Sequence, residues 1–225
     1  MNRTSQTLTE MYEAMRGAFG HRAWWPGETP LEICVGAVLT QNTNWRNVEK
    51  ALANLKQGGC LSLSALDALP LPTLAELIRP AGYYNVKARR LKNFVAAMRE
   101  GFGDDLAAFL DRPVPVLREA LLAVRGIGRE TADSIILYAA GKCSFVVDAY
   151  TYRVLLRHGL IAPEDDYEAI KELFESALPQ DAELWNDYHA QLVEVGKRHC
   201  RPVARCDGCP LEPFPHDAQA GTQDG

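Results

Sequence analysis

A single carboxylate, Asp148, follows an apolar run and stands eighteen residues after Glu130. Upstream of both, Gly126-Ile127-Gly128 places two glycines around one apolar residue, between two helical patterns. Glycines accept positive φ and let another backbone approach closely. The free N–H groups at the start of the following helix suit a phosphate. A phosphate-binding hairpin followed by an acid predicts an enzyme that holds a nucleic-acid backbone and does chemistry beside it.

The composition is that of a globular protein. The chain has 225 residues, a hydrophobic fraction of 47% and a net charge of −5. No segment approaches the ~20 apolar residues of a membrane span. The N-terminus lacks an apolar signal region, so we expect a cytoplasmic protein. Negative net charge alone disfavours nucleic-acid binding. Two basic runs, within residues 87–92 and 197–205, nevertheless favour a DNA-facing surface over a merely solvated charged face.

Apolar residues recur with helical periodicity nearly throughout, and we find no convincing strand. Thr29-Pro30-Leu31-Glu32 predicts a helix start, with Thr as N-cap and Pro at the first helical position. The segment 144–147 is predicted to be a loop that packs apolar groups. The predicted fold class is all-α, with two lobes and a cleft between them. Residues 22–140 form one lobe that ends in the hairpin, and residues 1–21 with 141–225 form the other.

The pattern L-x-x-V-x-G-I-G-R-E-T-A, followed by V-V-D-A-Y-T-Y-R, resembles the helix-hairpin-helix/Gly-Pro-Asp superfamily of DNA glycosylases, relatives of endonuclease III. The resemblance implies that Gly126 and Gly128 hold DNA phosphates. It also implies that Asp148 promotes departure of a flipped base, by stabilising positive charge on the sugar and by positioning or activating water.

One departure from endonuclease III concerns the type of reaction. Bifunctional relatives have a Lys two residues after the second hairpin glycine, where this chain has Glu130. A carboxylate cannot form an imine, so no Schiff-base lyase step is expected. Glu130 either contributes to the base pocket or only caps its helix, since acids favour the first turn.

The N-terminal half resembles the bacterial 3-methyladenine DNA glycosylase III branch. The resemblance rests on A-W-W-P at 23–26, G-A-V-L-T-Q-N-T-N-W at 36–45, and R-P-x-G-x-Y-N-x-K-A at 79–88. It implies that an aromatic sandwich holds the flipped base. The positions that it assigns to base binding are Trp24 and Trp45, with Trp25, Pro26 and Glu130 nearby.

The chemistry of the base supports this assignment. N-alkylated purines such as 3-methyladenine are cationic, and a desolvated indole face attracts a cation by about 1–2 kcal/mol. Alkylation also makes the base a good leaving group, and a damaged base is cheaply extruded from the duplex. Ordinary core packing is the alternative for these tryptophans. Because two adjacent tryptophans point in different directions, we expect Trp25 to be the one that packs in the core.

Four further residues are assigned to DNA contacts by the same resemblance. Gln41 matches the position where relatives insert a side chain into the gap left by the flipped base. Tyr83 matches a second wedge position, and wedging is a known way to unstack a base step. Lys87 and Arg153 are expected at phosphates, with simple surface solvation as the alternative for both.

Three cysteines cluster near the C-terminus as Cys200-x5-Cys206-x2-Cys209. This spacing resembles the iron–sulfur loop of endonuclease III relatives, which has four Cys at x6, x2 and x5. Here the first gap is one residue short and the fourth Cys position falls on Pro215. A 4Fe–4S cluster is the favoured interpretation, with a Cys3His zinc site and no metal as alternatives. The fourth cluster ligand would be solvent, His199 or His216. In each case we expect the loop to be structural.

These features together predict a monofunctional DNA glycosylase that hydrolyses the N-glycosidic bond of alkylated purines, chiefly 3-methyladenine, in base excision repair. The expected partner is double-stranded DNA with alkylated bases, and we expect a monomer without membrane association. Two alternatives stay open at this point. One is an endonuclease III-type pyrimidine-damage glycosylase with a weak lyase, and the other is a non-catalytic hairpin protein that binds DNA.

Overall fold

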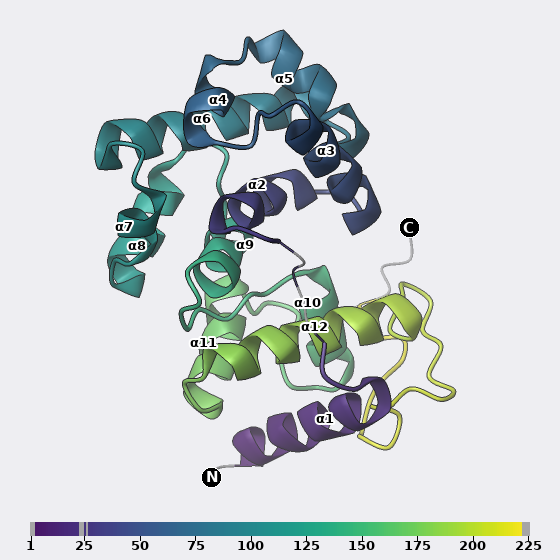
Figure 1. The fold of residues 1–225 in the computed structure, drawn as a ribbon. Helices are drawn as coiled ribbons and strands as arrows, with labels where there is room; N and C mark the ends of the chain where they lie inside the picture. Colours follow the sequence, from purple (N-terminus) through teal and green to yellow (C-terminus); the bar gives the residue numbers. More distant parts are fainter. Residues whose placement is uncertain (1–2, 23–24, 26, 222–225) are drawn as a thin grey trace. The chain divides into compact units, whose positions relative to one another are not determined.

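The computed structural model describes residues 3–22, 25 and 27–221 (Figure 1). Within these ranges the chain is built of helices and loops, without a strand, so the all-α prediction is confirmed. None of the helices described is long and apolar enough to cross a membrane. The chain divides into two compact units, one of residues 25–142 and one that combines the N-terminal segment with the residues from Cys143 onward.

The unit of residues 25–142 holds most of the helices. In chain order they are α2 (Pro30–Thr40), α3 (Trp45–Gln57), α4 (Leu63–Ala68), α5 (Leu71–Leu77), the 3₁₀ turn η1 (Arg79–Ala81), α6 (Tyr84–Phe102), α7 (Leu106–Leu110), α8 (Val114–Ala123), α9 (Arg129–Ser134) and the π-helical turn η2 (Ile135–Ala139). Helix α2 is apolar nearly all round and packs against α3, α6 and η2. It begins as predicted, because the Thr29 side chain accepts a hydrogen bond from the Glu32 N–H and Pro30 follows the cap.

The second unit contains α1 (Arg3–Phe19), α10 (Ala149–Arg157), α11 (Tyr167–Ala177) and α12 (Ala182–Arg198). Helix α12 packs against both α1 and α10 (Figure 1). An aromatic core holds the unit together: Phe145 stacks on Phe174 with ring centroids 3.8 Å apart, and Tyr188 meets both rings edge-on. The segment 144–147 is buried and not helical, as predicted. It leads directly into Asp148.

Candidate active site

The glycine hairpin joins α8 to α9 and has the geometry that its sequence predicts. Gly126 has a φ of 101°, and a Cβ there would lie 2.4 Å from Cγ of Arg90. Only glycine therefore fits without moving Arg90. Ile127 is buried and anchors the hairpin. Gly128 is the exposed, extended N-cap of α9, with nothing within 4 Å of an added Cβ. Phosphate binding by the hairpin stays a prediction.

Gln41 is bound to the hairpin by hydrogen bonds. Its Nε2 donates to the Gly126 carbonyl at 3.2 Å and to Thr131 Oγ1 at 2.8 Å, and Arg90 donates to its Oε1. A role in filling the duplex gap is untested. In the free protein the Gln41 side chain stabilises the hairpin. To fill the duplex gap, it would have to exchange these hydrogen bonds for hydrogen bonds to DNA.

Tyr83 stands at the N-cap of α6 in the left-handed region, with a φ of 45°. A non-glycine residue with positive φ is uncommon and stores strain, and such positions cluster at functional sites. Its side chain is 71% exposed, although it is a large aromatic ring. A strained turn that presents an exposed ring suits the predicted wedge role.

The expected phosphate contact of Lys87 does not fit the structure. Its side chain is 1% exposed, and its Nζ donates to the carbonyls of Leu39 at 2.9 Å and Ala81 at 2.7 Å. Burial lowers its pKa to about 8, and the nearby charge of Arg90 adds to this effect. Lys87 thus satisfies the carbonyl groups at the ends of α2 and η1. The sequence signal was wrong because a basic run on a helix does not reveal which of its members face inward.

Trp25 and Trp45 form an aromatic cluster with Tyr138, whereas Trp24 and Pro26 lie outside the described residues. The Trp25 ring stacks on Tyr138 with centroids 4.8 Å apart, and Trp45 meets Trp25 edge-on at 5.1 Å. An added Cβ on Gly36 would lie 3.4 Å from each indole. The Nε1 atoms of Trp25 and Trp45 are buried without a hydrogen-bond partner among the described residues. Tyr138 lies in η2, and π-helical turns are frequent at functional sites.

Asp148 is the N-cap of α10, and its two carboxylate oxygens have different partners. Oδ1 accepts from the Thr151 N–H at 2.7 Å and from Thr151 Oγ1 at 3.0 Å. Oδ2 lies 3.5 Å from Nε2 of His189, on α12. Burial alone would raise the pKa of Asp148. The hydrogen bonding and charge of His189, together with Thr151, outweigh burial and lower this pKa below its ordinary value. The carboxylate is therefore held in its ionised form.

The sequence patterns did not identify His189 as a residue of the site. It is a buried residue on α12, beside the apolar residues that pack the unit. A histidine in such a stripe is usually a core residue, and no local spacing links it to Asp148, which precedes it by 41 positions. Glu130, in contrast, is exposed in the first turn of α9, which is consistent with either of its two predicted roles.

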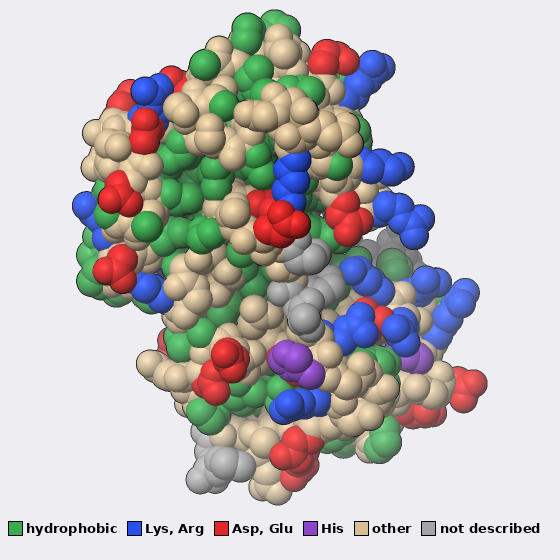
Figure 2. Space-filling model, in the orientation of Figure 1, with side chains coloured by type: hydrophobic (Ala, Val, Ile, Leu, Met, Phe, Trp, Pro, Cys, Tyr) green, Lys and Arg blue, Asp and Glu red, His purple; other side chains and the backbone are tan. Residues whose placement is uncertain are grey.

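Arg153 connects α10 to the cysteine loop. Its Nε donates to the Cys200 carbonyl at 2.6 Å, and its guanidinium lies over the Tyr150 ring at 5.4 Å. Its predicted phosphate contact is untested. The basic run that begins in the last turn of α12 is exposed, and Figure 2 shows Lys and Arg side chains gathered near the end of this helix. The members of the run are Lys197, Arg198, Arg201 and Arg205.

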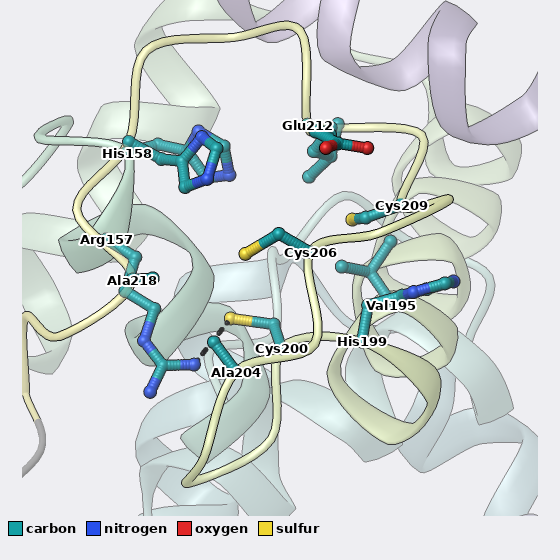
Figure 3. Close-up of a pocket in the computed structure, with 12 residues that line it drawn as sticks. Arg157, His158, Val195, His199, Cys200, Ala204, Cys206, Cys209, Glu212 and Ala218 are labelled. Atoms are coloured by element: carbon teal, nitrogen blue, oxygen red, sulfur yellow. Dashed lines mark hydrogen bonds between the residues drawn. The ribbon is translucent and has the colours of Figure 1, made fainter.

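The three loop cysteines line one pocket. Figure 3 shows their sulfur atoms directed toward this pocket, with His158 across from them and His199 turned away. No three His, Cys, Asp or Glu side chains among the described residues form a group that could hold a single metal ion.

Arg157 is a buried residue that anchors this loop. Its guanidinium donates to Cys200 Sγ at 3.2 Å and to the carbonyls of Arg201, Pro202 and Ala220. A buried cation is costly unless it is paired with negative charge. Its hydrogen bonds to three carbonyls and to the Cys200 sulfur hold the loop backbone against α10.

Comparison with known proteins identifies the family. Residues 35–180 match the family model of the HhH-GPD superfamily base excision DNA repair proteins. A protein from Methanocaldococcus jannaschii that is named as a DNA repair glycosylase is 46% identical over 210 residues, covering 93% of this chain and 96% of the relative. Endonuclease III of Thermotoga maritima is 31% identical over 187 residues and covers 81% of each chain. This chain belongs to the HhH-GPD superfamily.

Solved structures agree with this family. The H. pylori 3-methyladenine DNA glycosylase bound to 1,N6-ethenoadenine has a TM-score of 0.74 and 30% identity, and the match covers 87% of this chain and 97% of that one. An endonuclease III–DNA complex has a TM-score of 0.81 at 23% identity, covering 97% and 98%. That second match shows the fold alone. The protein is therefore a DNA glycosylase of base excision repair, a hydrolase that acts on N-glycosyl bonds, and the superfamily predicted from sequence is confirmed.

Proposed function

We propose that this glycosylase is monofunctional and excises alkylated purines, chiefly 3-methyladenine, from double-stranded DNA. The observation that carries the proposal is the cluster of Trp25, Trp45 and Tyr138, in which two indole N–H groups are buried without an acceptor among the described residues. A buried donor without an acceptor costs about 1–3 kcal/mol. A purine offers flat faces and ring-nitrogen acceptors, and an alkylated purine adds a positive charge that aromatic rings attract. The 30% identity with the H. pylori enzyme supports the same substrate class.

Asp148 is the group that we assign to cleavage. Departure of the base leaves positive charge on the sugar, and an ionised carboxylate in a desolvated site stabilises that charge. The lowered pKa of Asp148 keeps it ionised at neutral pH. An alkylated purine already carries a positive charge, so it leaves as a neutral base without being protonated. Water then adds to the sugar and releases a proton, and the product is an abasic site.

The absence of a lyase step rests on Glu130. It occupies the position at which bifunctional relatives carry their nucleophilic amine, and a carboxylate cannot form a Schiff base. The competing candidate, a pyrimidine-damage glycosylase with weak lyase activity, is favoured by the 31% identity with Thermotoga maritima endonuclease III. Trapping with borohydride separates the two, because it makes any enzyme–DNA imine permanent.

The experiment is a base-release assay on defined substrates. Purified protein is incubated with N-methylated DNA, and free 3-methyladenine is quantified by chromatography. Duplexes with an oxidised pyrimidine or a mismatch are tested beside it, with borohydride present. We expect release of 3-methyladenine, no trapped complex, and loss of release in Asp148→Asn with DNA affinity retained. Release of oxidised or mismatched bases instead would overturn the substrate assignment, and binding without any release would favour a non-catalytic protein.

We also propose that the loop of Cys200, Cys206 and Cys209 holds an iron–sulfur cluster. The shared pocket and the contact between Arg157 and Cys200 support this assignment. When bound, the cluster would cross-link the loop, and we assign it no step in base release. His158 is a candidate fourth ligand besides His216. Its Nδ1 donates to the carbonyl of Pro215, the residue at the missing cysteine's position, which leaves Nε2 to bind iron.

Metal analysis of protein purified without oxygen tests this assignment. We expect a brown protein that absorbs visible light and contains iron. Colourless protein with one equivalent of zinc, or with no metal after anaerobic reconstitution, would overturn it.

A further inference from the structure

We propose that His189 is a positioning residue for base excision, which donates a hydrogen bond from Nε2 to Asp148 Oδ2 and so fixes the orientation of the carboxylate. This inference rests on the proposed role of Asp148. Neither residue type nor spacing points to His189, so the proposal comes from the packing of α10 against α12 alone.

The geometry of the carboxylate explains why a second anchor is needed. Oδ1 is committed to the start of α10 through its two bonds to Thr151. These bonds fix one oxygen but leave rotation about it open. The imidazole, only 6% exposed, stands 3.5 Å from the other oxygen. That distance is long for a full hydrogen bond. Catalytic hydrogen bonds are often long in free enzymes and shorten when the substrate binds.

The electrostatic setting gives His189 a second effect. The Asp148 side chain is 14% exposed, so its charge has lost most of its water. Lys197 also has an electrostatic interaction with Asp148, and it lies about two turns further along α12. Lys197 also interacts electrostatically with Glu194 and Arg22, which reduces its effect on Asp148. His189 is in contact with the carboxylate, so it has the larger effect in keeping Asp148 ionised.

The packing role of a buried histidine predicts a different outcome from the positioning role. If His189 only fills space, then His189→Leu preserves function as long as the protein folds. If His189 positions Asp148, then His189→Leu lowers the single-turnover rate of base release by about 10- to 100-fold, because misplacing a reacting group can cost up to about 10²-fold. DNA affinity should change little, because His189 is buried and contacts the acid rather than DNA.

The test compares His189→Leu, His189→Gln and Glu183→Gln with wild type, on a base that wild type releases. Glutamine keeps an N–H donor without the charge, so we expect it to restore much of the rate that leucine loses. Glu183→Gln, at an exposed position on the same helix, should retain the rate within a few-fold. Folding is checked by thermal unfolding and DNA affinity by titration. A folded leucine variant with an unchanged rate overturns the proposal, as does a glutamine variant that is as slow as leucine.

A substrate-free measurement separates this inference from the proposed function. The Asp148 carboxyl is titrated by ¹³C NMR in wild type and in His189→Leu, and we expect the pKa to rise in the variant. An unchanged pKa overturns the electrostatic part whether or not the enzyme releases 3-methyladenine. If neither wild type nor any variant released a base from any tested substrate, that result would instead count against the proposed function.

Discussion

The ammonium group of Lys87 lies 2.9 Å from the carbonyl oxygen of Leu39, inside the unit of residues 25–142. A second carbonyl, that of Ala81, accepts from the same nitrogen at 2.7 Å. One long side chain therefore donates hydrogen bonds to carbonyl groups in the final turns of two elements, α2 and η1. A residue that seems from its neighbours in sequence to belong to a DNA-binding surface is instead part of the internal framework.

Removing this ammonium should cost stability rather than DNA affinity. In Lys87→Met two carbonyls lose their donor, and unpaired buried polar groups cost about 1–3 kcal/mol each. We therefore expect the free energy of unfolding to fall by about 2–4 kcal/mol in denaturant titrations. Lys50→Met is the matched control, because Lys50 is exposed on α3. A variant of Lys87 with wild-type stability and weakened DNA binding would restore the original phosphate prediction.

The pH dependence of stability should also reveal Lys87. Its pKa is about 8 in the folded protein, below the ordinary lysine value of 10.5. Between these two values the unfolded chain binds more protons than the folded one, so stability from this group rises with pH. Relative to Lys87→Met, wild type should gain about 1–2 kcal/mol between pH 7.5 and 9.5. A constant difference across that range would contradict the lowered pKa.

The two hairpin glycines should respond unequally to alanine. Gly126→Ala forces a positive φ on a residue with a side chain and pushes that side chain into Arg90. We expect a loss of about 1–3 kcal/mol. Gly128 has extended backbone and open space around it, so Gly128→Ala should change stability by less than about 0.5 kcal/mol. Thermal unfolding measures both, and equal losses would show that the hairpin geometry differs from that described.

Arg157 should control the order of the cysteine loop. In Arg157→Met three carbonyls and the Cys200 sulfur lose their shared donor. We expect proteolysis within residues 199–221 to become at least several-fold faster, as mass spectrometry of the fragments can measure, because the loop backbone loses its buried anchor. Arg205→Met, at an exposed position in the same loop, is the control. Equal cleavage rates in the two variants would contradict an anchoring role.

Features that depend on neighbouring residues were predictable from sequence. The Thr29 cap, the proline after it, the apolar loop 144–147 and the tight Gly126 turn all follow from local chemistry. Asp148 could be singled out because it follows that buried loop and its pattern matches the family. These features need only the residue types within a few positions of each other.

The contacts between distant elements were not predictable in this way. Helical periodicity shows that His189 and Lys87 lie on helices, but it does not show what packs against them. The stacking of Trp25 on Tyr138 joins residues more than a hundred positions apart, and a π-helical turn shifts the face on which Tyr138 lies. Burial of a cation or a histidine is decided by the partner across the interface, and no sequence neighbour specifies that partner.

The dual use of Asp148 has a consequence for how the chain can lose activity. Oδ1 caps the N-terminus of α10, and Oδ2 of the same side chain faces His189. Alanine at this position would remove an N-cap and weaken the fold, whereas asparagine is about as good a cap as aspartate. Few single substitutions of Asp148 would therefore abolish the reaction and leave the fold intact. Most replacements of Asp148 would destabilise the start of α10 as well as remove the carboxylate that we assign to cleavage.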